Sequence, residues 1–256
     1  MSRPVPPQVI PRPPTWALGE PAPWADVPPE QRSAVSIPRV LDALGALGQR
    51  GPVPADVDSD RLLGPTLMMT VNEAGVPGPL RVNAGVLAAL FEEEGESRLI
   101  LTRRSAGLRT HRGEVSLPGG RLDEGEDATM AALREAHEEV GLDPASVTTV
   151  GWIHPVMTMA STSVILPVLA TVAARPHLVA SPAEVERVFD VSLAELAEPG
   201  VFHEERWRIP GRTIPGSEDD AFAVRFFEVA GEMIWGATAR MLHELLSIVL
   251  TGTNGF

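Results

Sequence analysis

From about residue 83 onward, short apolar runs alternate with turn-forming residues. Residues 86–91 and 98–102 are two such runs, and the acidic turn 92–96 joins them, which predicts a hairpin of buried strands. Similar runs predict further strands at 148–153, 163–172, 206–209 and 221–229. The pattern therefore favours a sheet built from short, largely buried strands.

Helical periodicity occurs at three places. Residues 36–47 carry a short apolar stripe that ends at Gly48. Residues 127–140 form a second helical segment with Gly141 as its stop, and residues 237–250 predict a long closing helix. Strands before and after a central helix predict an α/β fold in which a mixed β-sheet is sandwiched between α-helices.

The N-terminal region has a different composition. Ten of the 25 prolines fall in the first 30 residues, and proline lacks the backbone donor that helices and sheets use. We therefore predict an extended, largely unpacked arm over 1–32, dispensable for folding, which Trp16 and Trp24 attach to the body. A helical extension and linker over 33–82 and one domain over 83–256 complete the expected organisation.

Composition narrows the class of protein. The chain of 256 residues is 44% hydrophobic, and its longest nearly apolar stretch, 164–174, is far shorter than the roughly 20 residues that span a bilayer. Cysteine is absent, which excludes disulfides, zinc-thiolate sites and thiol catalysis. We expect a cytoplasmic protein without a membrane partner.

Charge is distributed unevenly. All 21 cationic residues are arginines, and the net charge of -13 disfavours nucleic acid as a partner. Residues 101–121 nevertheless hold five arginines against one glutamate, and residues 122–139 hold seven acids against one arginine. The sequence thus places a cationic block next to an anionic one, and the arginines are Arg103, Arg104, Arg109, Arg112 and Arg121.

The anionic block contains the most informative spacing. On a helix, residues three and four apart share a face, so Glu138 and Glu139 both lie beside Glu135. Carboxylate oxygens suit Mg²⁺ or Mn²⁺, which share their remaining ligand positions with water and substrate phosphates. A Gly-Gly turn upstream permits close approach of the backbone, and neighbouring arginines provide forked donors for phosphate.

The segment from Gly120 to Leu142 reads G-x5-E-x7-R-E-A-x-E-E-x-G-L and resembles the Nudix box at each of its defined positions. The resemblance implies the Nudix fold and hydrolysis of a nucleoside diphosphate linked to another moiety. It implies that Glu135, Glu138 and Glu139 hold Mg²⁺ or Mn²⁺ with the carbonyl of Gly120. It also implies that Glu126 and Arg134 brace the loop against the helix. Metal cations would neutralise the diphosphate and lower the pKa of a bound water.

A second segment is similar to the signature of Nudix coenzyme A diphosphatases, L-L-T-x-R-S-x3-R-x3-G-x3-F-P-G-G. Residues 100–105 read I-L-T-R-R-S, and Arg109, Gly113 and the run 117–120 follow at the matching spacing. Ile100 and Leu117 depart from the signature, and Leu117 replaces an aromatic residue. The run 234–239 is similar to the I-W-G-x-T-A segment of that family. The signature implies that Arg104, Ser105 and Arg109 bind substrate. Arg103 and Arg112 are additional candidates for this role from the same segment.

These observations favour hydrolysis of coenzyme A or its derivatives to 3′,5′-ADP and an (acyl)phosphopantetheine. The alternatives are a Nudix hydrolase of ADP-ribose or another nucleoside diphosphate conjugate, and a non-catalytic module that senses a nucleotide. The general base stays open between a box glutamate and glutamates outside the box, which are Glu184, Glu186, Glu204 and Glu205. The oligomeric state also stays open, with a homodimer as one option. His137 is interpreted as a surface residue of the helix.

Overall fold

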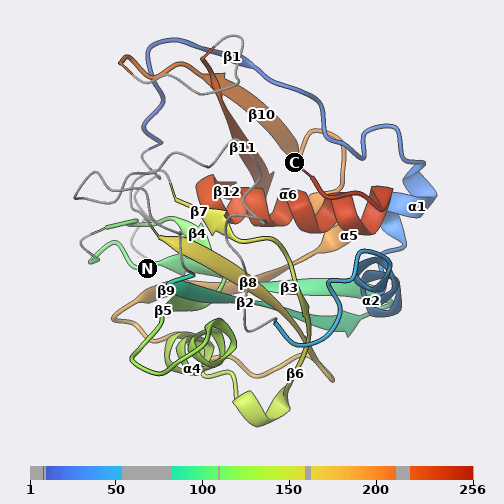
Figure 1. Ribbon diagram of the computed structural model, residues 1–256, viewed down its shortest axis with the longest axis vertical. Helices are drawn as coiled ribbons and strands as arrows, with labels where there is room; N and C mark the ends of the chain where they lie inside the picture. Colours follow the sequence, from blue (N-terminus) through green and yellow to red (C-terminus); the bar gives the residue numbers. More distant parts are fainter. Residues whose placement is uncertain are drawn as a thin grey trace, which may run out of the picture.

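The structure is a computed structural model that describes residues 8, 10–53, 82–108, 110–158, 163–211 and 220–255. Two β-sheets and two long helices are arranged in layers (Figure 1). Helix α4 (Ala128–Val140) covers one face of the larger sheet. Helix α6 (Gly236–Thr251) lies on the opposite face, between the larger and the smaller sheet. The predicted mixed sheet between helices is therefore confirmed.

The larger sheet, as far as the structure describes the chain, has eight strands. Strands β2 (Ala84–Glu93) and β3 (Glu96–Arg104) form the predicted antiparallel hairpin. Strand β2 also pairs in parallel with β8 (Val164–Val172), which makes the sheet mixed. The remaining strands are β4 (Val115–Ser116), β5 (Gly119–Arg121), β6 (Val147–Trp152), β7 (Val156–Met157) and β9 (Val185–Ser192).

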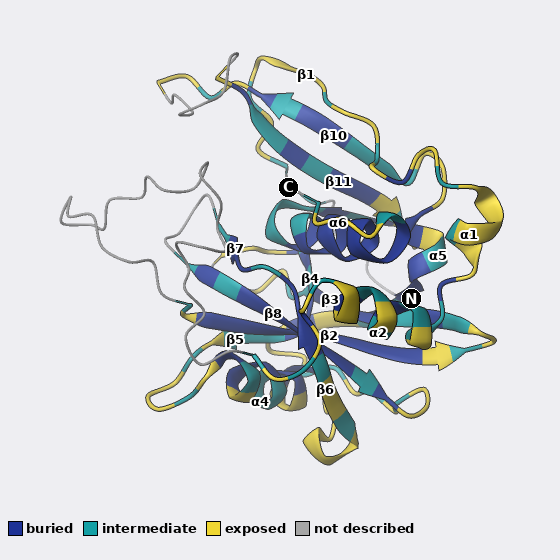
Figure 2. Ribbon diagram, turned by 45° about the vertical axis from the view of Figure 1, so that its right-hand side comes forward, coloured by how far each residue is buried: buried dark blue, intermediate teal, exposed yellow. Residues whose placement is uncertain are grey.

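Alternation along β2 divides the core in two. Val86, Ala88 and Leu90 face the cluster that contains the α6 side chains. Leu87 and its alternate neighbours face the cluster that contains the apolar stripe of α4. Because successive side chains of a strand point to opposite faces, a run that is apolar at every position requires a layer on each face. Figure 2 shows the resulting continuous burial along the central strands.

The smaller sheet has the order β1-β10-β11-β12 and is antiparallel throughout. Its strands are β1 (Trp16–Leu18), β10 (Phe202–Trp207), β11 (Phe222–Val229) and β12 (Glu232–Trp235). The prediction of a strand at 206–209 begins too late, because the polar run 203–206 hides the start of β10. Glu204 and Glu205 in that run are buried against Arg225 and Arg12.

Within the described residues the N-terminal arm is mostly exposed, as expected, but it is attached to the body at two places. Strand β1 pairs with β10, and Trp24 is only 1% exposed. The Trp24 indole stacks on Phe227 with a ring-centroid distance of 6.3 Å and lies 5.4 Å from Phe202. Proline removes backbone donors but does not prevent a neighbouring aromatic side chain from entering a core. The predicted domain boundaries stay a prediction.

Several short elements complete the fold. Helix α1 (Pro29–Ser33) precedes α2 (Ile37–Ala46), which confirms the helical stripe at 36–47. A 3₁₀ turn (Pro144–Ser146) follows α4, and α5 (Leu193–Leu196) follows β9. Sequence patterning misses β9, because charged side chains interrupt its apolar residues. In the parts of the chain that the structure describes, no helix has the length and apolar character needed to cross a membrane.

Candidate functional site

Helix α4 begins and ends where its capping residues predict. The Asp127 side chain accepts a hydrogen bond of 2.8 Å from the Met130 backbone N–H. Gly141 ends the helix in the left-handed conformation with φ of 69°, which glycine adopts without strain. The buried alanines of the helix face the sheet, and Glu135 and Glu139 lie on the side of the Gly119–Gly120 turn.

Three carboxylates converge at this turn. Glu135, Glu139 and Glu184 each offer one oxygen, and these oxygens lie within 4.8 Å of one another. Glu184 comes from the loop before β9, so the cluster joins two distant parts of the chain. The Glu138 side chain is 57% exposed and lies 3.3 Å from Nη1 of Arg134. The structure therefore brings together Glu135 and Glu139, adds Glu184, and leaves Glu138 at the rim of the cluster.

The glycine turn fits closely around the carboxylates. The Gly119 backbone N–H donates a hydrogen bond of 3.2 Å to Oε2 of Glu139. A Cβ atom at position 119 would collide with the backbone of Gly85 and Val86, and one at position 120 would displace the Glu135 carboxylate. Antiparallel pairing of β5 with β2, in which Gly120 lies opposite Gly85, fixes the turn in place.

The surroundings of Glu139 disfavour the ionised form of its carboxyl group. Burial raises the pKa of Glu139 to about 7, and the neighbouring charges of Glu135 and Glu184 act in the same direction. The Gly119 N–H and the Arg104 guanidinium oppose this rise only in part. A carboxylate that is 2% exposed beside two like charges needs a cation to be ionised at low cost. Oxygen donors in this arrangement fit Mg²⁺ or Mn²⁺.

Arg134 braces the loop that leads into α4. Its guanidinium donates to Glu126 at 2.8 and 3.0 Å and to the Arg121 carbonyl oxygen at 3.0 Å. The hydrogen bond from Arg134 lowers the pKa of Glu126 to about 2. A further contact of 3.0 Å joins Arg134 to Glu135, so the same side chain orients one member of the cluster.

The predicted substrate-binding residues separate in the structure. Arg104 Nη1 lies 3.5 Å from Oε1 of Glu139, at the cluster. Arg103, the preceding residue of β3, points to the other face and is buried, with its guanidinium 2.8 Å from Glu232 and 3.4 Å from Glu186. The structure therefore does not bring Arg103 to the site, because neighbouring strand residues face opposite sides.

Ser105 lies near the cluster, and Arg112 lies on the surface. The Ser105 backbone N–H donates a hydrogen bond of 2.7 Å to the Glu184 carbonyl oxygen, which holds the Glu184 loop against the end of β3. Arg112 is exposed and donates to the Leu108 carbonyl oxygen. Arg109 lies outside the described residues. His137 is exposed on α4, which confirms its interpretation as a surface residue.

Of the four glutamates considered outside the box, only Glu184 reaches the cluster. Glu186 pairs with Arg103, and Glu204 and Glu205 belong to the smaller sheet. No spacing in the sequence distinguishes Glu184 from the others, because a loop residue is positioned by the packing of β9 on β3 and not by local periodicity.

Fold and site together define an α/β protein that presents carboxylates and an arginine around a glycine turn. The family model described as NUDIX domain matches residues 79–229. The chain therefore belongs to the Nudix family.

Named relatives agree with this membership. The chain is 38% identical over 173 residues to "Nudix hydrolase 15, mitochondrial" of Arabidopsis thaliana. This alignment covers 64% of this chain and 58% of the plant protein. It is 31% identical over 172 residues to "Nudix hydrolase 3" of Caenorhabditis elegans. This second alignment covers 64% of this chain and 72% of the nematode protein. The match thus spans less than two thirds of the plant relative's length.

Among solved structures, a Nudix hydrolase from M. smegmatis, RenU, is similar with a TM-score of 0.39 and 26% identity. That match covers 48% of this chain and 77% of the other.

Proposed function

We propose that this chain hydrolyses the diphosphate bond of coenzyme A or its derivatives to 3′,5′-ADP and an (acyl)phosphopantetheine. The observation that carries the proposal is the 3.5 Å approach of Arg104 to Glu139. Arg104 belongs to the segment that resembles coenzyme A diphosphatases, and Glu139 belongs to the Nudix box. The two residues are 35 positions apart in the sequence and meet at one carboxylate cluster.

Glu135 and Glu139, with the carbonyl of Gly120, are the residues that would hold Mg²⁺ or Mn²⁺, and one oxygen of Glu184 lies within 4.8 Å of an oxygen of each glutamate. When bound, the cation offsets the charge of the diphosphate and lowers the pKa of a bound water. Glu138 shares Arg134 with Glu135 and adds negative charge at the rim. The set fits a cation that keeps part of its coordination for substrate oxygens.

The chain's own residues bind and orient the reacting groups. Arg104 offers guanidinium donors to the phosphate that lies over the cluster, and Arg134 keeps Glu135 in position. Glu184 is exposed, so its carboxylate can accept the proton that the attacking water releases. The water oxygen bonds to one phosphorus while the bond from that phosphorus to the bridging oxygen breaks, and the bridging oxygen leaves with the other phosphate.

Product analysis tests this function. Wild-type protein is incubated with Mg²⁺ or Mn²⁺ and, separately, coenzyme A, ADP-ribose, NADH and diadenosine polyphosphates, and products are identified by mass spectrometry. We expect 3′,5′-ADP and phosphopantetheine from coenzyme A at the highest kcat/KM. Faster cleavage of ADP-ribose, with coenzyme A left intact, would refute the substrate and keep only Nudix membership.

A further inference from the structure

Arg103 lies on the face of β3 opposite Arg104 and contacts both sheets. Its guanidinium lies 2.8 Å from Glu232 of β12 and 3.4 Å from Glu186 of β9, and its side chain is 10% exposed. Arg187 also reaches Glu232, at 3.1 Å. The signature of coenzyme A diphosphatases leaves position 103 undefined, so that resemblance assigns Arg103 no role.

The contact with Glu186 falls on a β-bulge. Arg103 pairs with Arg187, and the next residue of β3 pairs with Val185. Glu186 is therefore an extra residue of β9 between two consecutive positions of β3. Such bulges bend a strand and redirect the side chains beside them, and they are frequent next to active sites. Two positions before this bulge lies Glu184, whose carboxylate belongs to the cluster.

The direction of the Glu184 side chain depends on how its backbone is held. Glu184 is exposed, so little packing holds its carboxylate in place. On the side before Glu184, the Ser181 backbone N–H donates a hydrogen bond of 2.8 Å to the Glu139 carbonyl oxygen. At Glu184 itself, the carbonyl oxygen accepts a hydrogen bond of 2.7 Å from the Ser105 backbone N–H. On the side after Glu184, the ion pair of Arg103 with Glu186 holds the bulge.

We propose that Arg103 is a positioning residue, which holds the Glu186 bulge and thereby keeps the Glu184 carboxylate at the cluster. Glu232 fixes the guanidinium from the smaller sheet, so this arginine connects that sheet to the Glu184 loop. The role rests on the proposed function, in which Glu184 accepts the proton of the attacking water. Proton transfer needs the acceptor within hydrogen-bond reach, and a displacement of about 1 Å can lower the rate by about 100-fold.

Kinetics of single variants test the proposal first. We measure kcat and KM at saturating Mg²⁺ for the substrate that wild type cleaves fastest among coenzyme A, ADP-ribose, NADH and diadenosine polyphosphates, so a substrate other than coenzyme A leaves this test intact. Glu186→Gln removes the charge at the bulge and keeps the pair of Arg103 with Glu232, and Arg103→Met removes the guanidinium. We expect each change to lower kcat about 10- to 100-fold and to leave KM nearly unchanged.

Two further features separate positioning from a change in electrostatic potential. Glu186→Gln and Arg103→Met change the net charge in opposite directions, so an effect of charge alone on kcat would have opposite signs. We expect the same sign, a loss. Arg103→Lys, which keeps a cation near Glu186 and Glu232, should restore part of kcat.

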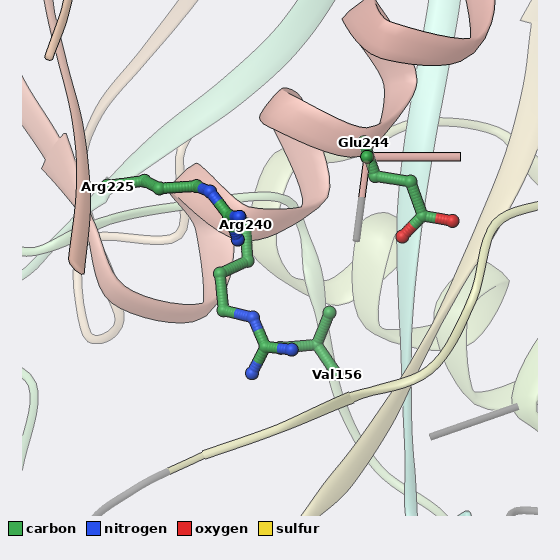
Figure 3. A pocket seen from close by; sticks show the side chains of 5 residues that line it. Val156, Arg225, Arg240 and Glu244 are labelled. Atoms are coloured by element: carbon green, nitrogen blue, oxygen red, sulfur yellow. The ribbon is translucent and has the colours of Figure 1, made fainter. Parts of the chain in front are cut away.

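Arg225 provides a matched control for the loss of an ion pair. It reaches from β11 toward Arg240 of α6 (Figure 3), its side chain is 17% exposed, and it pairs with Glu204 at 3.4 Å. Arg103→Met and Arg225→Met should both lower the melting temperature, because each removes one partner of a buried ion pair. Only Arg103→Met is expected to lower kcat.

A double-mutant cycle then decides whether Arg103 acts through Glu184. In the Glu184→Gln background, Glu186→Gln and Arg103→Met should lower kcat no further, whereas independent effects would multiply. Wild-type kcat in folded Glu186→Gln, or an equal loss of kcat in both backgrounds, would overturn the positioning role and leave the proposed function in place. Wild-type kcat in Glu184→Gln would refute the proposed base, and the positioning role with it.

Discussion

At the scale of single residues, Glu139 shows most clearly how the site is built. Its carboxylate is 2% exposed, accepts a hydrogen bond from Gly119 and lies close to Glu135, Glu184 and Arg104. Ionising a buried carboxyl group costs free energy when no cation is near, and a bound cation offsets that cost. These surroundings support the proposed part of Glu139 in binding a cation more strongly than the exposed position of Glu138 supports the same role for that residue.

The change Glu139→Gln tests this part. Glutamine keeps the volume and can still accept from Gly119, but it removes the charge, so we expect kcat/KM at saturating Mg²⁺ to fall by about 10²- to 10³-fold or more. Because the change also removes buried like-charge repulsion, the metal-free variant should unfold at the same or a higher temperature than wild type at pH 8. Near-normal turnover by the folded variant would contradict the assignment.

Glu184 and Glu138 form a matched pair for a second prediction. Both are exposed glutamates, but only Glu184 has an oxygen within the three-carboxylate cluster. We expect Glu184→Gln to lower kcat by about 10²-fold or more, as loss of a general base does. Glu138→Gln should have the smaller effect on kcat. Equal effects of the two changes on kcat would argue against Glu184 as the base.

The sequence could predict part of this site. The spacing of Glu135, Glu138 and Glu139 on one helix is local, so the shared face follows from helical geometry alone. The burial of Glu139, the exclusion of Arg103 from the site and the arrival of Glu184 depend on which strands pair. Strand pairing joins residues far apart in the chain, and no periodicity in the sequence reports it.

At the scale of elements, the N-terminal arm forms a strand pairing that the sequence analysis does not predict. Strand β1 extends the smaller sheet, and Trp24 fills a place between β10, β11 and α6. Elements with strong local signals, such as α4 with its Asp127 and Gly141 caps, are predicted well. Elements that exist because a partner strand is available are not predicted well: β1 has only three residues in a proline-rich segment, and charged side chains interrupt the apolar residues of β9.

Trp24 and Trp16 give a matched test of the arm. Truncating a buried tryptophan removes a large packed surface, so we expect Trp24→Ala to lower the free energy of unfolding by about 3–5 kcal/mol. Trp16 is 46% exposed, and Trp16→Ala should cost much less. Urea unfolding measures both changes. If deletion of residues 1–30 left the unfolding midpoint unchanged, the packing described for this arm would be wrong.

At the scale of the whole molecule, α6 holds the layers together. Twelve of its 16 residues are buried, because one face meets the larger sheet and the other meets the smaller one (Figure 2). His243 of α6 contacts Trp24 and Phe202 with ring-centroid distances of 5.5 and 5.3 Å. Because His243 packs between the two sheets, its protonation changes the free energy of unfolding.

His243 predicts how stability depends on pH. Its pKa falls from 6.5 in the unfolded chain to about 3 in the folded protein, chiefly because of burial. Below pH 6.5 the unfolded chain therefore binds a proton that the folded protein does not, and the free energy of unfolding falls by about 1.4 kcal/mol per pH unit. Above pH 6.5 this contribution is constant.

The change His243→Leu should remove that slope. Urea unfolding at pH 7.5 and 4.5 is expected to show wild type losing about 2–3 kcal/mol more than the variant between the two values. Carboxylates that titrate in this range affect both proteins alike. Parallel loss of stability in wild type and variant would mean that His243 is protonated in the folded state.

The most direct test of the proposed activity is a competition in one tube. Coenzyme A and ADP-ribose at equal concentration are incubated with wild-type protein and Mg²⁺ or Mn²⁺, and the initial ratio of products equals the ratio of the two kcat/KM values. We predict that 3′,5′-ADP and phosphopantetheine exceed AMP and ribose 5-phosphate, and that Glu139→Gln abolishes both pairs of products. Predominant release of AMP and ribose 5-phosphate, or cleavage that survives Glu139→Gln, would contradict the account.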